Sequence, residues 1–565
     1  MLTPWGETLD RERVLQEYPR PQLRRDSYLN LNGTWEYAIT EAPGIPDRFD
    51  GEILVPFSPE SVLSGVGRTL WPGAYLWYRR TVTLPAGFRR GRLLLQFGAV
   101  DQIATVYVDG TELFTHVGGF TPFTVDVTDA ARSDSFTLLV RVSDTTDSAG
   151  MTFGKQRLRH GRIWYPPQSG IWQTVWMESV PENYIRGVRI IPHFDKRQVE
   201  LWVAGSGTCT AQFAGGTHSF PAGRPARLDV PDMHPWSPED PFLYDLRLTL
   251  GEDAVDSYFA MRKFSVERDS AGDMRLTLNG RPYYQNGVLD QGYWSDGLLT
   301  APSDEALIYD IELAKSMGFN MLRKHMKIEP LRWYYHCDRL GMLVWQDMPA
   351  GGTSRNPLIV SLPLITGIQL RDNRYGLFGR RSAEGRTQFY RELHEMVAAL
   401  FNCPCVAMWV PFNEGWGQFD SAKVCAGILS MDTSRVIDHA SGWHDQGIGF
   451  VRSLHVYGRS FRMKDVPSSR AIVLSEFGGY TLRIDGHCRP GRAFGYRRFD
   501  SANSYKYALL DLYKHQILPA HSEGLSASVY TQLSDVEDEL NGLVTYDRRV
   551  VKLSPKLMCG IVKIY

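Results

Sequence analysis

The chain has 565 residues, of which 43% are hydrophobic, 12% aromatic and 22% charged, with 62 Lys and Arg against 63 Asp and Glu. This composition excludes a disordered, collagenous or membrane-embedded chain. The length predicts about two to four domains, because a single core rarely exceeds about 250–300 residues. The net charge of −1 provides no overall field to attract phosphates or an anionic lipid surface, so we expect neither a nucleic-acid partner nor a membrane partner.

The cysteines and the start of the chain indicate the compartment. Seven cysteines are scattered along the chain, and only Cys403 and Cys405 lie close together. An odd, dispersed set is typical of reduced thiols, and a Cys-x-Cys pair without a second Cys or His pair nearby is a weak metal signal. Residues 1–20 contain no apolar segment of a signal peptide, and no stretch approaches 18 apolar residues. We therefore expect a cytoplasmic protein.

Residues 30–265 consist of short alternating runs separated by Gly, Pro, Asp and Asn, a pattern typical of antiparallel sandwiches. A second set of such runs begins after residue 183 and ends near residue 266. Its length of about 85 residues suits one immunoglobulin-like sandwich. We therefore predict a first β domain over residues 1–180 and an immunoglobulin-like β-sandwich over residues 181–266.

From residue 267 to residue 565 apolar strands alternate with helical periodicity. The segments 304–317 and 387–401 each carry an apolar face and end at a helix-terminating residue. We predict strands at eight positions, namely 283–289, 319–323, 342–346, 406–411, 434–438, 450–455, 470–475 and 526–531. Strands alternating with helices over about 300 residues favour a (β/α)8 TIM barrel over an open sheet. No dinucleotide or phosphate loop follows the early strands.

Two predicted strands end in a glutamate beside glycines. The fourth strand leads into Asn413 and Glu414, and the seventh leads into Glu476. Reactive groups of such barrels lie at the carboxyl ends of the strands, and strands four and seven lie nearly across the barrel from each other. Glycoside hydrolysis needs a pair of this kind, with one carboxylic acid to protonate the leaving oxygen and one carboxylate to meet the anomeric carbon. A glutamate of this kind taken alone is more often a helix-cap partner or a member of a surface ion pair.

Together with these residues, several segments resemble glycoside hydrolase family two, the group of β-galactosidases, β-glucuronidases and β-mannosidases. The resemblance covers essentially the whole chain and includes 169–173, 318–325, 331–338, 341–347 and 475–478. It implies a jelly-roll sugar-binding-like domain, an immunoglobulin-like domain and a catalytic barrel. Because members of this family often assemble through their β domains, the resemblance also implies a homo-oligomer.

The resemblance assigns roles to individual residues. Glu414 corresponds to the general acid/base and Glu476 to the nucleophile of a retaining double displacement, in which the carboxyl groups lie about 5–5.5 Å apart. Asn413 is expected to hydrogen-bond the sugar 2-hydroxyl. Arg323 is expected to keep Glu476 ionised and Tyr457 to donate to it, with a surface ion pair and core packing as the respective alternatives. The other residues expected to line the sugar site are His325, Asp290, Trp294, Asp347, Trp416 and Tyr530.

The segment 538–548 bears on the identity of the sugar. β-Glucuronidases resemble this stretch but carry Asn-x-Lys, whose asparagine and lysine bind the substrate carboxylate. Alignment on the shared Gly542 places Glu539 and Asn541 at those two positions. Because an acidic residue repels a uronate, we expect a neutral sugar, with β-galactosides first, followed by β-mannosides, β-glucosides or arabinosides, and with β-glucuronides disfavoured. We interpret two arginine groups, on the loops after strands three and seven, as solvated surface: 371, 374, 380 and 381, and 489, 492, 497 and 498.

Two other classes of protein remain to be compared with an enzyme of this kind. A carbohydrate-binding protein built on an inactive barrel would not need both carboxylates, so the presence of Glu414, Glu476 and Asn413 favours the enzyme. Hydrolysis by a serine nucleophile would need an elbow such as Gly-x-Ser-x-Gly, which the sequence lacks. We therefore predict an exo-acting retaining β-glycosidase that acts on a carbohydrate substrate without a cofactor or an essential metal.

Overall fold

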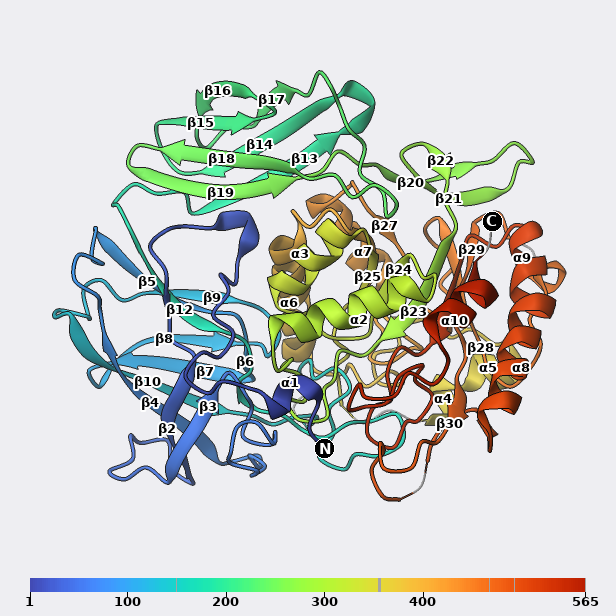
Figure 1. Ribbon diagram of the computed structural model, residues 1–565, viewed down its shortest axis with the longest axis horizontal. Helices are drawn as coiled ribbons and strands as arrows, with labels where there is room; N and C mark the ends of the chain where they lie inside the picture. The colour runs from blue at the N-terminus through green and yellow to red at the C-terminus, as the bar shows by residue number, and fades with distance from the viewer. Residues whose placement is uncertain (149, 354–356, 467, 492, 564–565) are drawn as a thin grey trace.

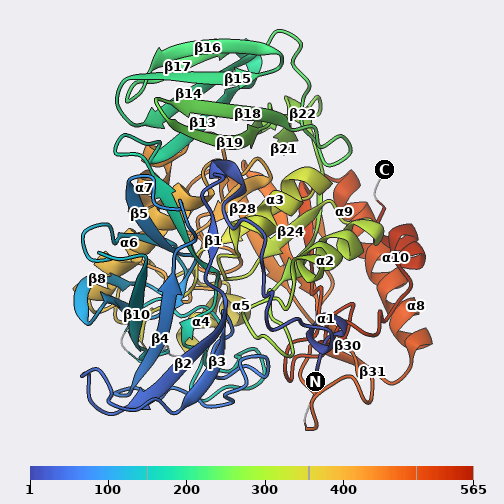
Figure 2. The same cartoon turned by 60° about the vertical axis from the view of Figure 1, so that its left-hand side comes forward.

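The computed structural model describes residues 1–148, 150–353, 357–466, 468–491 and 493–563. In Figure 1 the blue and cyan strands form a sandwich at the left, the green strands form a second sandwich at the top, and the yellow-green to red part of the chain forms a barrel with helices around it. Figure 2 shows the second sandwich above the other two bodies after a rotation of 60°. No helix in the described ranges is both long and apolar enough to cross a bilayer.

The first sandwich encloses a hydrophobic core between two antiparallel sheets. Along β2 (Gly33–Thr40) Trp35 and Tyr37 are buried, whereas Thr34 and Glu36 are exposed, as expected for a strand with one face in the core. The larger sheet has the order β3-β2-β4-β10-β7-β8, with β3 (Gly51–Val55), β4 (Tyr75–Thr83), β10 (Ser135–Ser143), β7 (Ile103–Val108) and β8 (Thr111–Val117). The smaller sheet has the order β1-β12-β5-β9, with β1 (Leu29–Asn30), β12 (Val175–Val180), β5 (Arg92–Phe97) and β9 (Phe123–Asp126).

The second sandwich consists of a three-stranded and a four-stranded sheet. Their orders are β13-β14-β17 and β16-β15-β18-β19, with β13 (Gly187–His193), β14 (Gln198–Ala204), β15 (Thr208–Phe213), β16 (Gly216–Pro221), β17 (Ala226–Asp229), β18 (Tyr244–Leu250) and β19 (Asp253–Phe259). The strand β20 (Phe264–Arg268), which we expected to complete this sandwich, pairs instead with β21 (Met274–Leu278). The expected limit at residue 266 therefore falls inside a strand of another sheet, and the division of the chain at residues 180 and 266 stays a prediction.

The barrel sheet is entirely parallel, with the order β27-β26-β25-β24-β23-β32-β29-β28. Its strands overlap the eight predicted ranges: β23 (Gln285–Asp290), β24 (Met321–Lys324), β25 (Leu343–Asp347), β26 (Val406–Val410), β27 (Val436–Ile437), β28 (Val451–Val456), β29 (Ala471–Gly478) and β32 (Ala527–Thr531). Their apolar runs are recognisable in sequence because parallel strands are covered on both faces. The two end strands, β27 and β28, are not paired with each other in the described sheet, so the barrel is nearly but not fully closed. The predicted fold class is confirmed.

Helices alternate with the barrel strands and cover the outside of the barrel (Figure 1). The helix α2 (Asp304–Ser316) begins at Ser303, whose hydroxyl accepts from the Ala306 N–H over 3.2 Å, and it ends before Gly318, which adopts a φ of +91°. The other helices of this layer include α3 (Leu331–Leu340), α6 (Ala383–Leu400), α7 (Ser421–Met431), α8 (Ala502–Leu512) and α10 (Pro555–Val562).

One segment of the first domain, residues 150–168, reaches the carboxyl end of the barrel. Thr152 forms a β-bridge with Gly351, which follows β25. The Tyr165 hydroxyl donates to Glu539, after β32, over 2.7 Å. Side chains from outside the barrel can therefore contribute to its mouth.

Candidate active site

The two predicted glutamates face each other at the carboxyl end of the barrel. Glu414 follows β26 and has a φ of +51°, and its N–H donates to the Ser441 carbonyl over 2.9 Å. Glu476 lies in β29. One oxygen of each carboxylate and one ring nitrogen of His455 all lie within 4.8 Å of one another. The residues Glu414 and Glu476 are 7% and 5% exposed, so both are largely buried.

The neighbours of Glu476 stabilise its ionised form. Its Oε1 accepts from Arg323 Nη1 over 3.1 Å, and its Oε2 accepts from the Tyr457 hydroxyl over 2.6 Å. Burial by itself raises the pKa of a carboxyl group. At Glu476 this effect is outweighed by the charges of His455 and Arg323 and by the Tyr457 hydrogen bond, so its pKa lies below the ordinary value. The side chain is therefore held as a carboxylate.

His455 contacts both glutamates. Its Nδ1 lies 2.7 Å from Glu414 Oε1 and 3.5 Å from Glu476 Oε2, whereas its Nε2 lies 3.0 Å from Ser441 Oγ. A proton on Nδ1 lets His455 donate to Glu414 when that carboxyl group is ionised. The residue Ser441 in turn contacts Ser475, on the strand that carries Glu476.

Arg323 holds a group of polar residues on one side of the glutamates. Its Nη2 donates to Asn413 Oδ1 and to Asp347 Oδ2, each over 2.8 Å. The Asn413 amide nitrogen is buried and has no protein partner in the described part of the chain, so its two N–H groups are available to a ligand. His325 Nδ1 lies 2.5 Å from Asp347, and burial together with the charges of Lys155 and Arg323 keeps the pKa of His325 well below its ordinary range. His325 is therefore neutral.

Glu539 and Asn541 lie next to each other after β32. The Asn541 amide donates to Glu539 Oε1 over 3.1 Å, and the Tyr165 hydroxyl donates to Glu539 Oε2. Gln532 donates to Asn541 Oδ1 over 2.8 Å. Burial raises the pKa of Glu539 despite the opposing charge of Lys155. Neutral donors thus engage both the Glu539 carboxyl group and the Asn541 amide oxygen. The positive charge that acts on Glu539 belongs to Lys155, a residue of the first domain.

Trp416 lies beside this group. Its ring is 4.9 Å from the Trp164 ring, 6.2 Å from the His325 ring and 5.1 Å from the Lys155 ammonium. The structure thus brings ten of the thirteen predicted site residues into one region: Glu414, Glu476, Asn413, Arg323, His325, Asp347, Tyr457, Trp416, Glu539 and Asn541.

Three other predicted residues lie elsewhere. The Asp290 carboxylate is occupied by Lys324 Nζ at 2.6 Å and by the Gly292 N–H. The Trp294 ring packs against Trp5 and against the guanidinium of Arg548, 4.3 Å away, in the core beneath the N-terminal segment. Both side chains thus have partners outside the group around the two glutamates, and a sugar contact of either residue stays a prediction.

Tyr530 does not form the floor of the site. Neighbouring side chains of a strand point to opposite faces, and in β32 it is Thr531 whose hydroxyl lies 2.8 Å from Tyr457. The fully buried Tyr530 ring instead packs against Phe477 and beneath Gly478. A strand end predicted to within one residue therefore does not determine which of two adjacent side chains faces the substrate.

Sequence reasoning missed four residues of this region: His455, Lys155, Tyr165 and Tyr496. His455 lies two positions before Tyr457. Because side chains alternate between the two faces of a strand, this spacing could have identified His455 as a neighbour of Tyr457. Tyr496 stacks on Tyr457 with ring centroids 3.7 Å apart. It comes from the segment between β29 and α8, and Lys155 and Tyr165 come from another domain, so no local pattern identifies these three.

The two arginine groups are not simply solvated. Arg380 is buried and donates to the Gly417 carbonyl over 2.8 Å, next to the loop that follows Glu414. Arg489 forms an ion pair with Glu537. The interpretation of Arg380 as solvated surface was wrong, and Arg492 lies outside the described residues.

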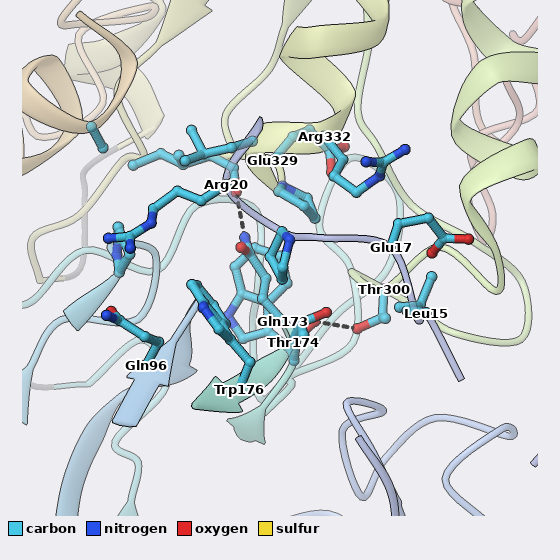
Figure 3. Close-up of a pocket in the computed structure, with 18 of the residues that line it drawn as sticks. Leu15, Glu17, Arg20, Gln96, Gln173, Thr174, Trp176, Thr300, Glu329 and Arg332 are labelled. Carbon is cyan, nitrogen blue, oxygen red and sulfur yellow. Dashed lines mark hydrogen bonds between the residues drawn. The ribbon is translucent and has the colours of Figure 1, made fainter. Parts of the chain in front are cut away.

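A separate cavity of about 170 Å³ lies between the first domain and the barrel, beneath residues 15–20 (Figure 3). Gln173 and Thr300 are tied by hydrogen bonds to the backbone, as the dashed lines show. The arginines of its wall are in ion pairs, Arg20 with Glu178 and Arg332 with Asp304. Neither Glu414 nor Glu476 lines this cavity. It therefore does not belong to the site described above.

Comparisons with known proteins agree along the chain. The domain described as "Glycosyl hydrolases family 2, TIM barrel domain" matches residues 271–550, "Glycosyl hydrolases family 2" matches residues 183–262, and "Glycosyl hydrolase 2 galactose-binding domain-like" matches residues 67–170. A β-glucuronidase from Streptococcus agalactiae is 24% identical over 427 residues, which cover 70% of this chain and 68% of that protein.

Two further relatives extend this comparison. A β-galactosidase from Thermoanaerobacter pseudethanolicus is 22% identical over 64% of this chain and 47% of its own length. The solved structure of a β-glucuronidase from an uncultured Clostridium superposes with a TM-score of 0.74 over 95% of this chain and 98% of that one, at 18% identity. This structural likeness supports the shared fold.

Proposed function

The chain belongs to glycosyl hydrolase family 2 and is a glycoside hydrolase, and from this premise we propose that it is a retaining exo-β-glycosidase with β-glucuronides as its first candidate substrates. The observation that carries the retaining mechanism is the separation of the two carboxylates. An oxygen of Glu414 and an oxygen of Glu476 lie within 4.8 Å of each other, which fits the spacing of about 5–5.5 Å of a retaining pair better than the spacing of about 6.5–9.5 Å of an inverting pair.

We assign the two steps as follows. A Glu476 oxygen attacks the anomeric carbon while Glu414 gives its proton to the leaving oxygen, so the glycosidic bond breaks and a glycosyl ester of Glu476 forms. Glu414 then takes a proton from a water molecule, whose oxygen attacks the same carbon and releases Glu476 as a carboxylate. The lowered pKa of Glu476 supports its role as nucleophile, and the His455 N–H supports the ionised Glu414 between the two steps.

Asn413 completes the reacting group. Its unpartnered amide N–H groups are suited to the sugar 2-hydroxyl, a contact that strengthens as charge develops in the transition state. Arg323 fixes the position of Asn413 from the other side, so the amide has no freedom to turn away.

The choice of glycone rests on the relatives and on charge. Most of the relatives are named β-glucuronidase, including that of Streptococcus agalactiae, and this moves the β-glucuronide ahead of the β-galactoside that we expected. β-Galactosides stay a second candidate because Glu539 and Asn541 stand where the uronate-binding pair is expected and because one relative is named β-galactosidase. A homo-oligomer and a cytoplasmic location also stay predictions.

The test measures nitrophenol release from the 4-nitrophenyl β-glucuronide, β-galactoside, β-glucoside and β-mannoside and from the 4-nitrophenyl arabinoside. The proteins compared are wild type, Glu476→Gln and, as a control, Glu384→Gln on the exposed first turn of α6. We expect wild type to release nitrophenol from at least one of these glycosides, Glu476→Gln to lose at least about a thousandfold in kcat, and Glu384→Gln to keep its activity. Proton NMR should detect the β-anomer as the first product. The α-anomer as first product, or full activity of Glu476→Gln, would contradict the assignment.

A further inference from the structure

Lys155 differs from the other buried lysines of the described chain. Lys324 donates to Asp290 and Glu329, Lys327 donates to two backbone carbonyls, and Lys552 donates to Asp535 and the Leu540 carbonyl. Lys155 is only 5% exposed, yet its ammonium forms no hydrogen bond or ion pair with any residue that the structure describes. An ammonium this little exposed and without a hydrogen-bond acceptor is costly, so such a group points to a ligand.

The surroundings of this ammonium place it in the sugar site. It lies 5.1 Å from the centroid of the Trp416 ring, 5.6 Å from that of Tyr165 and 5.8 Å from that of Trp164. The carboxylates whose charges act on it include Glu539, Glu476 and Glu414, whereas burial lowers its pKa. Lys155 therefore faces the same space as the reacting glutamates, from the side of Glu539.

The backbone holds Lys155 in this position. The Lys155 carbonyl accepts from the Tyr165 N–H over 3.0 Å, and Gln156 forms a β-bridge with the same residue. Gln156 also donates to Asp101 over 2.7 Å. The segment is thus anchored on both sides of the lysine, and the ammonium is presented to the site by a fixed backbone.

We propose that Lys155 is the specificity-determining residue of this site and that its ammonium pairs with the carboxylate at C5 of a β-uronide. This inference rests on the retaining glycosidase proposed above and names its substrate class. Asn541, at the position where β-glucuronidases carry lysine, has its amide engaged by Glu539 and Gln532. The cation that a uronate requires is therefore supplied by the first domain instead of by the barrel.

The carboxyl group of Glu539 is compatible with this role. Its two oxygens accept from Tyr165 and Asn541, and burial raises its pKa, which favours the protonated form and weakens the repulsion of a second carboxylate. A lysine ammonium acts on such a carboxylate as a point charge with three donors, and a charge-assisted hydrogen bond is about twice as strong as a neutral one.

The experiment compares 4-nitrophenyl β-glucuronide with 4-nitrophenyl β-glucoside, which differ only in carboxylate against hydroxymethyl at C5. For Lys155→Met we expect kcat/KM on the glucuronide to fall about 10- to 100-fold, and kcat/KM on the glucoside to stay within about threefold. Lys155→Arg should retain part of the preference. Lys423→Met, at an exposed lysine of α7, serves as the control, and circular dichroism melting verifies that each variant is folded.

A binding measurement separates recognition from chemistry. In the Glu476→Gln background, calorimetric titration with free glucuronate and glucose should show glucuronate binding more tightly, and Lys155→Met should abolish the difference. The assignment of Lys155 would be overturned if Lys155→Met lowered kcat/KM equally on both glycosides, or left the ratio of the two values unchanged. It would also be overturned by Lys155-dependent turnover of a sulfated galactoside without turnover of any uronide. Wild type that hydrolyses only neutral glycosides would overturn this inference and leave the retaining glycosidase standing, whereas wild type without activity on any glycoside would overturn the glycosidase itself.

Discussion

Glu414 and Glu476 are the same residue type in one pocket, and different donors surround them. Glu476 accepts from Arg323 and from the Tyr457 hydroxyl, while Glu414 accepts from His455. A group that donates to a carboxylate stabilises its charged form and lowers its pKa. The donors to Glu476 keep it ionised, which supports its proposed role as the nucleophile.

Tyr457→Phe tests this at the residue scale. Without the hydroxyl, the pKa of Glu476 rises toward its ordinary value, so Glu476 becomes protonated at a higher pH as the solution is acidified. We expect the acid limb of the kcat/KM profile to move to higher pH by about 0.5–1 unit, and kcat/KM at the optimum to fall about tenfold. Tyr530→Phe, whose hydroxyl has no contact with Glu476, should leave the limb in place. An unmoved limb in Tyr457→Phe would show that the hydroxyl does not act on the ionisation of Glu476.

At the scale of the element, β29 positions Glu476 through an irregular register. Its pairing with β32 shifts between Leu474 and Phe477, and its pairing with β28 shifts after Leu454. Such bulges redirect side chains and are frequent next to active sites. Gly478 ends the strand with a φ of +85°, and a Cβ there would lie 2.4 Å from Cε2 of the Tyr530 ring. The tyrosine that fills this space thus requires glycine two residues after Glu476.

We expect Gly478→Ala to lower kcat/KM about 10- to 100-fold, because the strand must shift away from Tyr530 and misplaces Glu476. Gly486→Ala is a matched control, since Gly486 has a φ of +84° and nothing within 4 Å of the added Cβ. A combined Gly478→Ala and Tyr530→Leu variant should recover part of the activity. If both glycine variants lose the same activity, the backbone angle and not the contact with Tyr530 is responsible.

At the scale of the whole molecule, buried carboxyl groups lie where the first domain meets the barrel. Glu392 of α6 accepts from Thr152 in the first domain and from Gln388. Burial raises the pKa of Glu392 from 4.5 to about 7. Between these values the folded protein keeps a proton that the unfolded chain releases, so the free energy of unfolding falls as the pH rises from about 4.5 to about 7.

The melting temperature should therefore decrease between pH 5 and pH 8, and the decrease should be smaller in Glu392→Gln. The contribution of one such group is at most about 3 kcal/mol, obtained from the pKa difference. Calorimetry at the two pH values measures the effect, and Glu384→Gln on the exposed end of the same helix should match wild type. A decrease of equal size in Glu392→Gln would mean that this carboxyl group does not lose a proton in that range.

How far the sequence predicts this protein differs between the barrel and the site. The strand positions follow from apolar runs that are local in the chain, and the family match confirms the fold. Asp290 and Tyr530 lie at the ends of β23 and β32 and Trp294 lies after β23, but their side chains turn to Lys324, to Phe477 and to Trp5 respectively. A one-residue difference in register reverses the face of a strand, and sequence patterns do not resolve strand ends that finely.

The sequence by itself determined the fold class and the family and singled out the two glutamates, because each inference rests on residues that lie close together in the chain. Only the tertiary structure decided that His455 contacts both glutamates and that Lys155 approaches Glu539. In the chain, the second sandwich and the first four strands of the barrel lie between Lys155 and Glu414. Its place in the site is a consequence of how the domains pack, and packing between distant segments leaves no local pattern in the sequence.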